Sequence, residues 1–106
     1  MDDQTEKMIQ DKGLTAPRVT QAEIDELIKQ VNYHIFPGTT VTVCCITLEN
    51  GYNVIGSSAC ASIENFDIEI GAAIALKEAK NKIWQLEGYL LREKLYNDKY
   101  RNEVKR

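Results

Sequence analysis

The sequence has few of the residues that mark secreted, membrane or metal-binding proteins. Its 106 residues include three cysteines, one histidine, two prolines and six glycines. No apolar run approaches the roughly 18 residues needed to cross a bilayer, and the first ten residues are acidic and polar, unlike a signal peptide. We therefore expect an intracellular, soluble protein with no disulfide framework and a single domain over residues 1–106.

An excess of basic residues is also missing. Thirteen Lys and Arg against sixteen Asp and Glu give a net charge of −3, which argues against a protein that coats long nucleic acids. Neither GxxxxGK[ST] nor GxGxxG occurs, so both common phosphate-binding loops are absent. Cys44, Cys45 and Cys60 lack the CxxC spacing and the histidine partners of a zinc site, and we interpret them as small apolar strand residues.

Catalytic groups are equally scarce. His34 is the only histidine, and its position before Pro37 is typical of a structural residue. Glu64, Asp67 and Glu69 cluster where a helix should begin, which favours helix capping over catalysis or metal binding. With no recognisable nucleophile and base, the sequence predicts a protein that is not an enzyme and has no cofactor.

The first half of the chain predicts one short helix, one capped helix and a hairpin. The short helix covers about residues 4–12 and ends at Gly13. Thr20 and Glu23 form the capping box T-x-x-E, and apolar residues at helical spacing extend the next helix over residues 21–33. Two β-branched runs, 39–48 and 52–60, flank Asn50-Gly51, which favours a two-residue type I′ hairpin turn with Cys44 opposite Ser57.

The second half predicts two helices. Helical spacing over about residues 67–85 and 87–98 is interrupted at Gly88, where we expect a break or bend. The fold class is therefore α+β, with an N-terminal helix, an antiparallel β-hairpin sheet and a C-terminal helical pair. Because a chain of this size has a thin core, we expect a homodimer or a higher homo-oligomer.

Three residues are candidates for ligand binding. Phe66 lies in a polar turn between Asn65 and Asp67, where it is either a hydrophobic staple or a platform on which a base stacks. Arg92 follows Leu90-Leu91 on a helix with an apolar stripe, so its guanidinium could bind a phosphate with two hydrogen bonds. Arg18, beside Pro17 in an extended segment, is the third candidate.

One long segment carries a family resemblance. Residues 46–95 contain, in order, the words NGY, SAC, NFD, EIG, IW, LEGY and LLRE, and KGLTAPRVT lies upstream. The segment resembles the phage gene-product 49/66 family, small proteins of tailed phages and prophages. It is also similar to the phage Thoeris anti-defence sponges. These proteins capture the cyclic ADP-ribose isomer made by bacterial TIR-domain immune enzymes and do not degrade it.

The resemblance implies a function and a set of contacts. The protein would sequester a cyclic nucleotide signal in the cytoplasm of the infected bacterial host. An adenine would stack on Phe66, and Arg92 would bind the pyrophosphate in a pocket shared between protomers, with Asn65 and Asp67 nearby.

The resemblance also implies a second site. Some sponges hold cyclic oligonucleotides of the CBASS system at a separate site in a higher oligomer, and here Arg18 and Thr20 would be its phosphate-binding residues. Two alternatives stay open from the residues alone. The first is a phage protein that binds another polypeptide through its hairpin and apolar helix faces. The second is a small nucleotide-cleaving enzyme that uses Glu64 or Asp67 with a metal.

Overall fold

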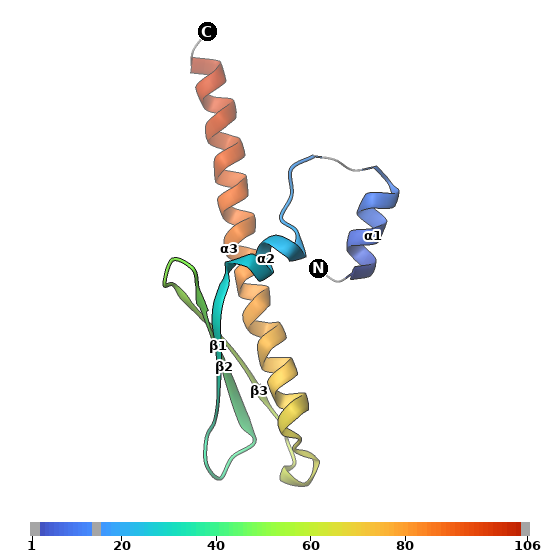
Figure 1. Cartoon of the computed structure of the whole chain (residues 1–106), viewed down its shortest axis with the longest axis vertical. Coiled ribbons are helices and arrows are strands. Elements are labelled where there is room, and N and C mark those ends of the chain that lie inside the picture. Colours follow the sequence, from blue (N-terminus) through green and yellow to red (C-terminus); the bar gives the residue numbers. More distant parts are fainter. Residues whose placement is uncertain (1–2, 14–15, 105–106) are drawn as a thin grey trace.

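The structure, a computed structural model, describes residues 3–13 and 16–104 and has the predicted α+β class (Figure 1). The short N-terminal helix is present, and Gly13 follows it with a φ of +66°. The elements in chain order are α1 (Asp3–Asp11), α2 (Gln21–Leu27), β1 (Ile28–Ile35), β2 (Val41–Leu48), β3 (Asn53–Ala59), the 3-10 helix η1 (Ile63–Asn65) and α3 (Ile68–Val104).

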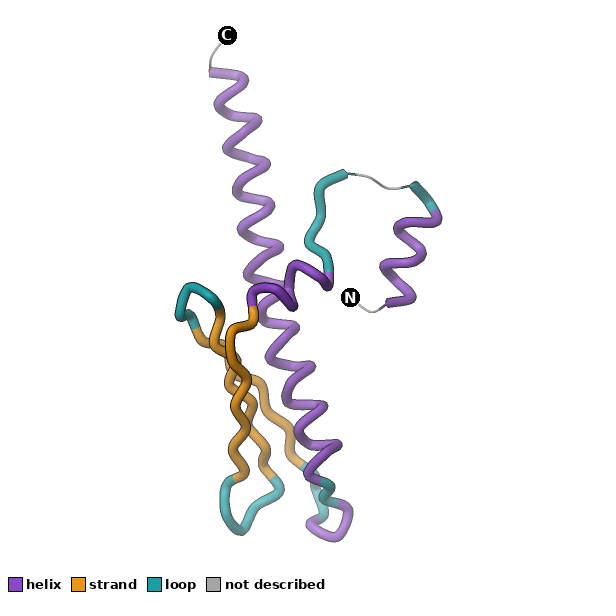
Figure 2. The backbone as a smooth tube through the Cα atoms, in the orientation of Figure 1, coloured by secondary structure: helices purple, strands orange, loops and turns teal. Residues whose placement is uncertain are grey.

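The three strands form one antiparallel sheet in the order β1-β2-β3, and the first half of α3 packs across it (Figure 2). Along β2, every second residue is buried against the helix, as expected when one face of a sheet is covered. The core therefore lies between α3 and the sheet. Its buried apolar side chains are Ile24, Cys44, Ile46, Leu48, Val54, Ala75, Ala79 and Ile83.

The predicted helix over residues 21–33 was wrong in its second half. Helix α2 ends at Leu27, and from Ile28 the chain is extended and forms β1. A β-bulge between Ile28 and Gln30 lets Val31 face the core opposite Ile46, although it follows Ile28 by three residues. With this bulge, the apolar residues of the strand have the same spacing as those of an amphipathic helix. Pairing with β2 selects the strand over the helix.

The hairpin turn has three residues where two were predicted. The amide of Leu48 donates to the carbonyl of Tyr52 (2.8 Å), and the amide of Gly51 donates to the carbonyl of Leu48 (2.9 Å). Gly51 has a φ of +89°, whereas none of the described non-glycine residues has a positive φ, which a type I′ turn would require of Asn50. The pattern is a type I turn followed by a glycine bulge, and it shifts the register by one residue.

This shift decides which residues of β3 face the helix. Cys44 pairs with Gly56, not with Ser57 as predicted. Gly56 is buried, and a β-carbon added to it would lie 2.1 Å from the carbonyl oxygen of Ala75 and 2.4 Å from the amide nitrogen of Ala79. The sheet and helix backbones therefore approach each other closely at a point that only glycine permits. All three cysteines are free, as expected.

The predicted C-terminal helical pair was also wrong, because α3 is a single helix of 37 residues. Gly88 lies inside it, exposed, and does not break it. One glycine costs a helix about 1 kcal/mol relative to alanine, and the surrounding Leu, Glu, Arg and Lys residues are good helix formers that offset this cost. The C-terminal half of α3 extends beyond the sheet, and the molecule measures 65 × 33 × 22 Å (Figure 1).

Gly88 offers a direct test of the continuous helix. A β-carbon added at this position meets nothing within 4 Å. We expect Gly88→Ala to raise the free energy of unfolding by about 0.5–1 kcal/mol, because alanine loses less backbone entropy on forming a helix. Urea denaturation followed by circular dichroism would measure this. A loss of stability would show instead that the helix bends at Gly88 in solution.

Candidate functional site

A cavity of about 210 Å³ lies where the chain passes from the sheet into α3. Phe66, which follows η1, is partly buried in its wall, with Asn65 and Asp67 on either side. Three consecutive residues proposed from the sequence thus line one cavity. The remaining lining residues come from the end of β3, the residue before β2 and the first turns of α3: Thr40, Ser58, Ala59, Cys60, Ile70, Gly71 and Ile74.

Local hydrogen bonds hold the turn that carries Phe66. Its amide donates to the carbonyl of Ile63 (3.2 Å), which closes η1. The Asp67 carboxylate accepts from the amide of Ile70 (3.0 Å), so Asp67 caps α3, as its place in the acidic cluster suggested. The Ser62 hydroxyl hydrogen-bonds to the exposed Glu64 carboxylate and lowers its pKa.

The inner wall of the cavity is mostly apolar and carries two hydroxyl groups, those of Ser58 and Thr40. The Ser58 hydroxyl donates to the carbonyl of Gly71 (2.7 Å), and the Thr40 hydroxyl donates to the carbonyl of Cys60 (2.6 Å). The Thr42 hydroxyl, beside Gly71, is buried and has no hydrogen-bond partner among the described residues. No sequence pattern indicated this wall, because β3 and α3 meet there only in the folded chain.

No cation among the described residues lines this cavity. Asp67 is the single charged residue in its lining. A nucleobase fits a wall of this kind, because an aromatic ring, hydroxyls and backbone groups can stack on and hydrogen-bond to a base. A phosphate beside Asp67 would need a positive group supplied from elsewhere.

Arg92 lies far from Phe66 in the same chain. It is exposed on the half of α3 that extends beyond the sheet, about 36 Å along the helix from its first residue. Beside it are Lys99 and two tyrosines, Tyr96 and Tyr100, whose rings stack with centroids 6.4 Å apart. One protomer therefore carries an aromatic cavity at one end of α3 and a cationic, aromatic patch toward the other.

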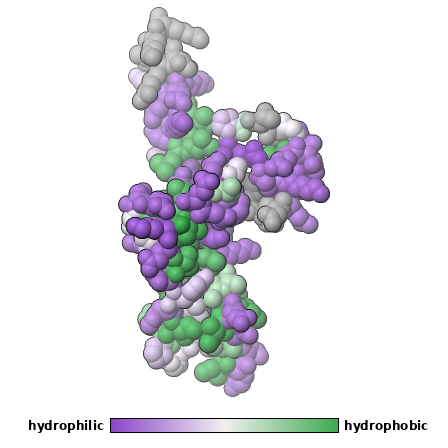
Figure 3. All heavy atoms as spheres, in the orientation of Figure 1, coloured by the Kyte–Doolittle hydropathy of each residue, from purple (hydrophilic) through white to green (hydrophobic). Residues whose placement is uncertain are grey.

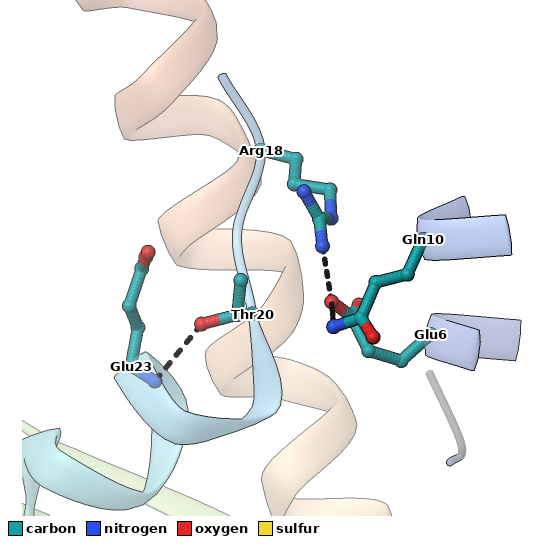
Figure 4. A network of polar contacts seen from close by, with 5 residues as sticks. All are labelled: Glu6, Gln10, Arg18, Thr20 and Glu23. Carbon is teal, nitrogen blue, oxygen red and sulfur yellow. Dashed lines mark hydrogen bonds and ion pairs between the residues drawn. The ribbon is translucent and has the colours of Figure 1, made fainter. Parts of the chain in front are cut away.

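Arg18 and Thr20 lie in a third place, beside α2 (Figure 4). The Arg18 guanidinium makes an ion pair with Glu6 of α1, and its Nε atom is buried without a hydrogen-bond partner. The Thr20 hydroxyl accepts a hydrogen bond from the amide of Glu23 (3.3 Å), which confirms it as the N-cap of α2. The carboxylates of Glu23 and Glu87 border the same surface, so a phosphate there would compete with acidic side chains.

The structure gives His34 and Cys44 the surroundings of structural residues. His34 is exposed and packs edge-on against Phe36, with ring centroids 4.7 Å apart. Burial raises the pKa of the Cys44 thiol, and neighbouring Cys45 raises it further, which keeps this thiol protonated. Within residues 3–13 and 16–104, no group of three His, Cys, Asp or Glu side chains is arranged to hold a metal ion. None of the described helices is both long and apolar enough to span a membrane.

Residues 19–95 match the model of the phage protein family described as N4 Gp49/phage Sf6 gene 66. The chain belongs to this family. The match includes β1, β2, β3, the Phe66 turn and Arg92. No curated protein and no solved structure matches the chain.

Proposed function

We propose that this phage protein binds a cyclic nucleotide immune signal and sequesters it without cleavage in the cytoplasm of the infected host. The ligand class is a cyclic ADP-ribose isomer of the Thoeris type, in keeping with the resemblance to sponges. One observation carries the proposal: no cation among the described residues lines the Phe66 cavity, which suits a base, whereas Arg92 and Lys99 line a separate cavity of about 250 Å³ on the other half of α3. Binding alone requires no catalytic group.

A second copy of the chain, antiparallel to the first, completes such a site. Ile70, Ile74, Tyr89 and Arg92 share one exposed flank of α3, because at 3.6 residues per turn their positions fall within about 100° of the helix circumference. Two α3 helices that run in opposite directions set Ile70 beside the partner's Tyr89 and, by two-fold symmetry, Tyr89 beside the partner's Ile70. The same register brings Phe66 toward the partner's Arg92.

The exposed surface supports this pairing. Ile70 is 60% exposed and Tyr89 is 68% exposed, which is high for large apolar or aromatic side chains. Apolar residues reach the surface at the lower end of the molecule and on the extended segment of α3 (Figure 3). The chain exposes 7996 Å², whereas a compact 12.0 kDa monomer exposes about 6,000 Å². This excess exceeds the roughly 800 Å² that each partner buries in a standard interface.

Arg18 and Thr20 are proposed as a second phosphate site at the axis of a higher oligomer, for cyclic oligonucleotides of the CBASS type. The buried Nε of Arg18 is a donor without an acceptor, and a phosphate would take the place that the Glu6 carboxylate now occupies.

Titration calorimetry tests the proposal. The purified protein is titrated with cyclic ADP-ribose isomers and with cyclic di- and trinucleotides, and the bound ligand is released by heat and identified by chromatography. We expect tight binding and intact release. New products would indicate cleavage. If none of these ligands binds, the exposed flank of α3 becomes the contact surface of a protein-interaction module, which is the alternative function.

Phe66→Ala separates stacking from packing. If a base stacks on Phe66, the substitution should weaken binding by about 1–3 kcal/mol while the free energy of unfolding changes little. Phe36→Ala is the matched control, because Phe36 is the other phenylalanine and lies outside the cavity. Calorimetry and urea denaturation of both variants measure the two effects. Unchanged affinity with lower stability would make Phe66 a hydrophobic staple.

A further inference from the structure

A larger cavity, of about 530 Å³, opens beside α3 and shares no lining residue with the Phe66 cavity. Its floor is one stretch of α3 that carries Lys77, Lys80, Asn81 and Trp84, and Gln21 at the start of α2 borders it. The volume lies in the range of small-molecule sites. Trp84 packs against the core and also lines this cavity.

The lysines and the indole lie on one line along the helix. Lys80 precedes Trp84 by one turn and Lys77 by two, so their Cα atoms lie about 6 and 10 Å from that of Trp84 along the axis. Lys77 is exposed and has no ion-pair partner among the described residues. A planar group stacked on Trp84 would therefore have its anionic substituent over two ammonium groups.

Asp25 of α2 orients the polar side chains at the rim. Its carboxylate accepts a hydrogen bond from the side-chain amide (Nε2) of Gln21 (3.0 Å) and makes an ion pair with Lys80 (3.3 Å). Gln21 and Asn81 present amides, which can hydrogen-bond to the edge of a base. Aromatic face, cations and amides thus border one cavity in a single protomer.

We propose that this cavity is a second nucleotide site that binds a nucleoside phosphate. The base stacks on Trp84, and Lys77 and Lys80 bind the phosphate. The site needs no second copy of the chain, unlike the proposed site at Phe66. The proposal for this cavity is therefore tested independently of the sequestration proposal.

Fluorescence of Trp84 tests the inference, because it is the single tryptophan of the chain. Adenosine monophosphate is the probe, with adenosine and inorganic phosphate as separate arms. We expect saturable quenching by the nucleotide, weaker quenching by adenosine, and weak competition by phosphate. Lys77→Gln should raise the Kd for the nucleotide about tenfold through loss of a charge-assisted hydrogen bond. Lys29→Gln, an exposed lysine of β1, should leave it unchanged.

Three results would overturn the inference. The first is no saturable quenching, or equal effects of Lys77→Gln and Lys29→Gln. The second is inorganic phosphate that competes at the concentrations at which the nucleotide binds, which would leave a phosphate site without base recognition. The third is loss of the Trp84 response in Phe66→Ala, which would assign all binding to the Phe66 site and leave the sequestration proposal intact. Trp84→Leu, measured by calorimetry, should lose nucleotide binding while an apolar side chain still fills the position.

Discussion

Replacing Gly56 by alanine should cost about 3 kcal/mol or more of the free energy of unfolding. The added β-carbon would lie 2.1 Å from the carbonyl oxygen of Ala75 and 2.4 Å from the amide nitrogen of Ala79, and both atoms belong to the α3 backbone. A backbone cannot rotate away as a side chain can, so β3 and α3 must separate along the packed interface. Ordinary overpacking costs about 1–3 kcal/mol, and this contact lies at or above the upper end.

Two other glycine variants serve as comparisons for Gly56→Ala in the same urea denaturation experiment. Gly71→Ala should cost less than Gly56→Ala, because its β-carbon meets the side-chain hydroxyl of Thr42 at 2.9 Å and that side chain can turn. Gly88→Ala should be stabilising, as argued above. If Gly56→Ala unfolds at the same urea concentration as the unchanged protein, the close approach of sheet and helix does not exist in solution.

Mixing two binding-deficient variants should restore binding. Arg92→Gln should weaken ligand binding about 10- to 100-fold through loss of a charge-assisted hydrogen bond to the phosphate, and Phe66→Ala should weaken it through loss of stacking. In a mixed dimer, one site has Phe66 from one chain and Arg92 from the other, and is intact. After joint unfolding and refolding of equal amounts, roughly a quarter of the normal number of tight sites should return.

The number of tight sites is measured by calorimetry, and native mass spectrometry counts the mixed dimers. The matched control mixes the Arg92→Gln variant with the double variant Phe66→Ala/Arg92→Gln. Because both chains lack Arg92, no dimer in this mixture has an intact site. Mixed dimers that form without regaining tight binding would show that Phe66 and Arg92 do not share a ligand. A protein that stays monomeric at all concentrations would contradict the shared site at once.

The sequence predicted those parts of the site that depend on neighbours along the chain. Asp67 caps α3, and the turn at Phe66 follows from its polar flanking residues and η1. Thr20 caps α2 for the same local reason. Arg92 was placed correctly on a helix, but its distance from Phe66 depends on whether α3 is broken at Gly88. The small free-energy cost of one glycine in a helix does not show from the sequence whether α3 breaks at Gly88.

Local sequence patterns by themselves determined the α+β class, both helix caps and the position of the hairpin turn, and the short motifs of residues 46–95 carried the family resemblance. Only the tertiary structure decided that residues 28–35 form β1, that Gly56 faces α3, and that Trp84, Lys77 and Lys80 border a cavity. The physical reason is that all three depend on contacts between residues far apart in the sequence. For β1, apolar spacing shows which residues favour burial, but a bulged strand and a helix can satisfy the same spacing, and pairing with β2 selects the strand.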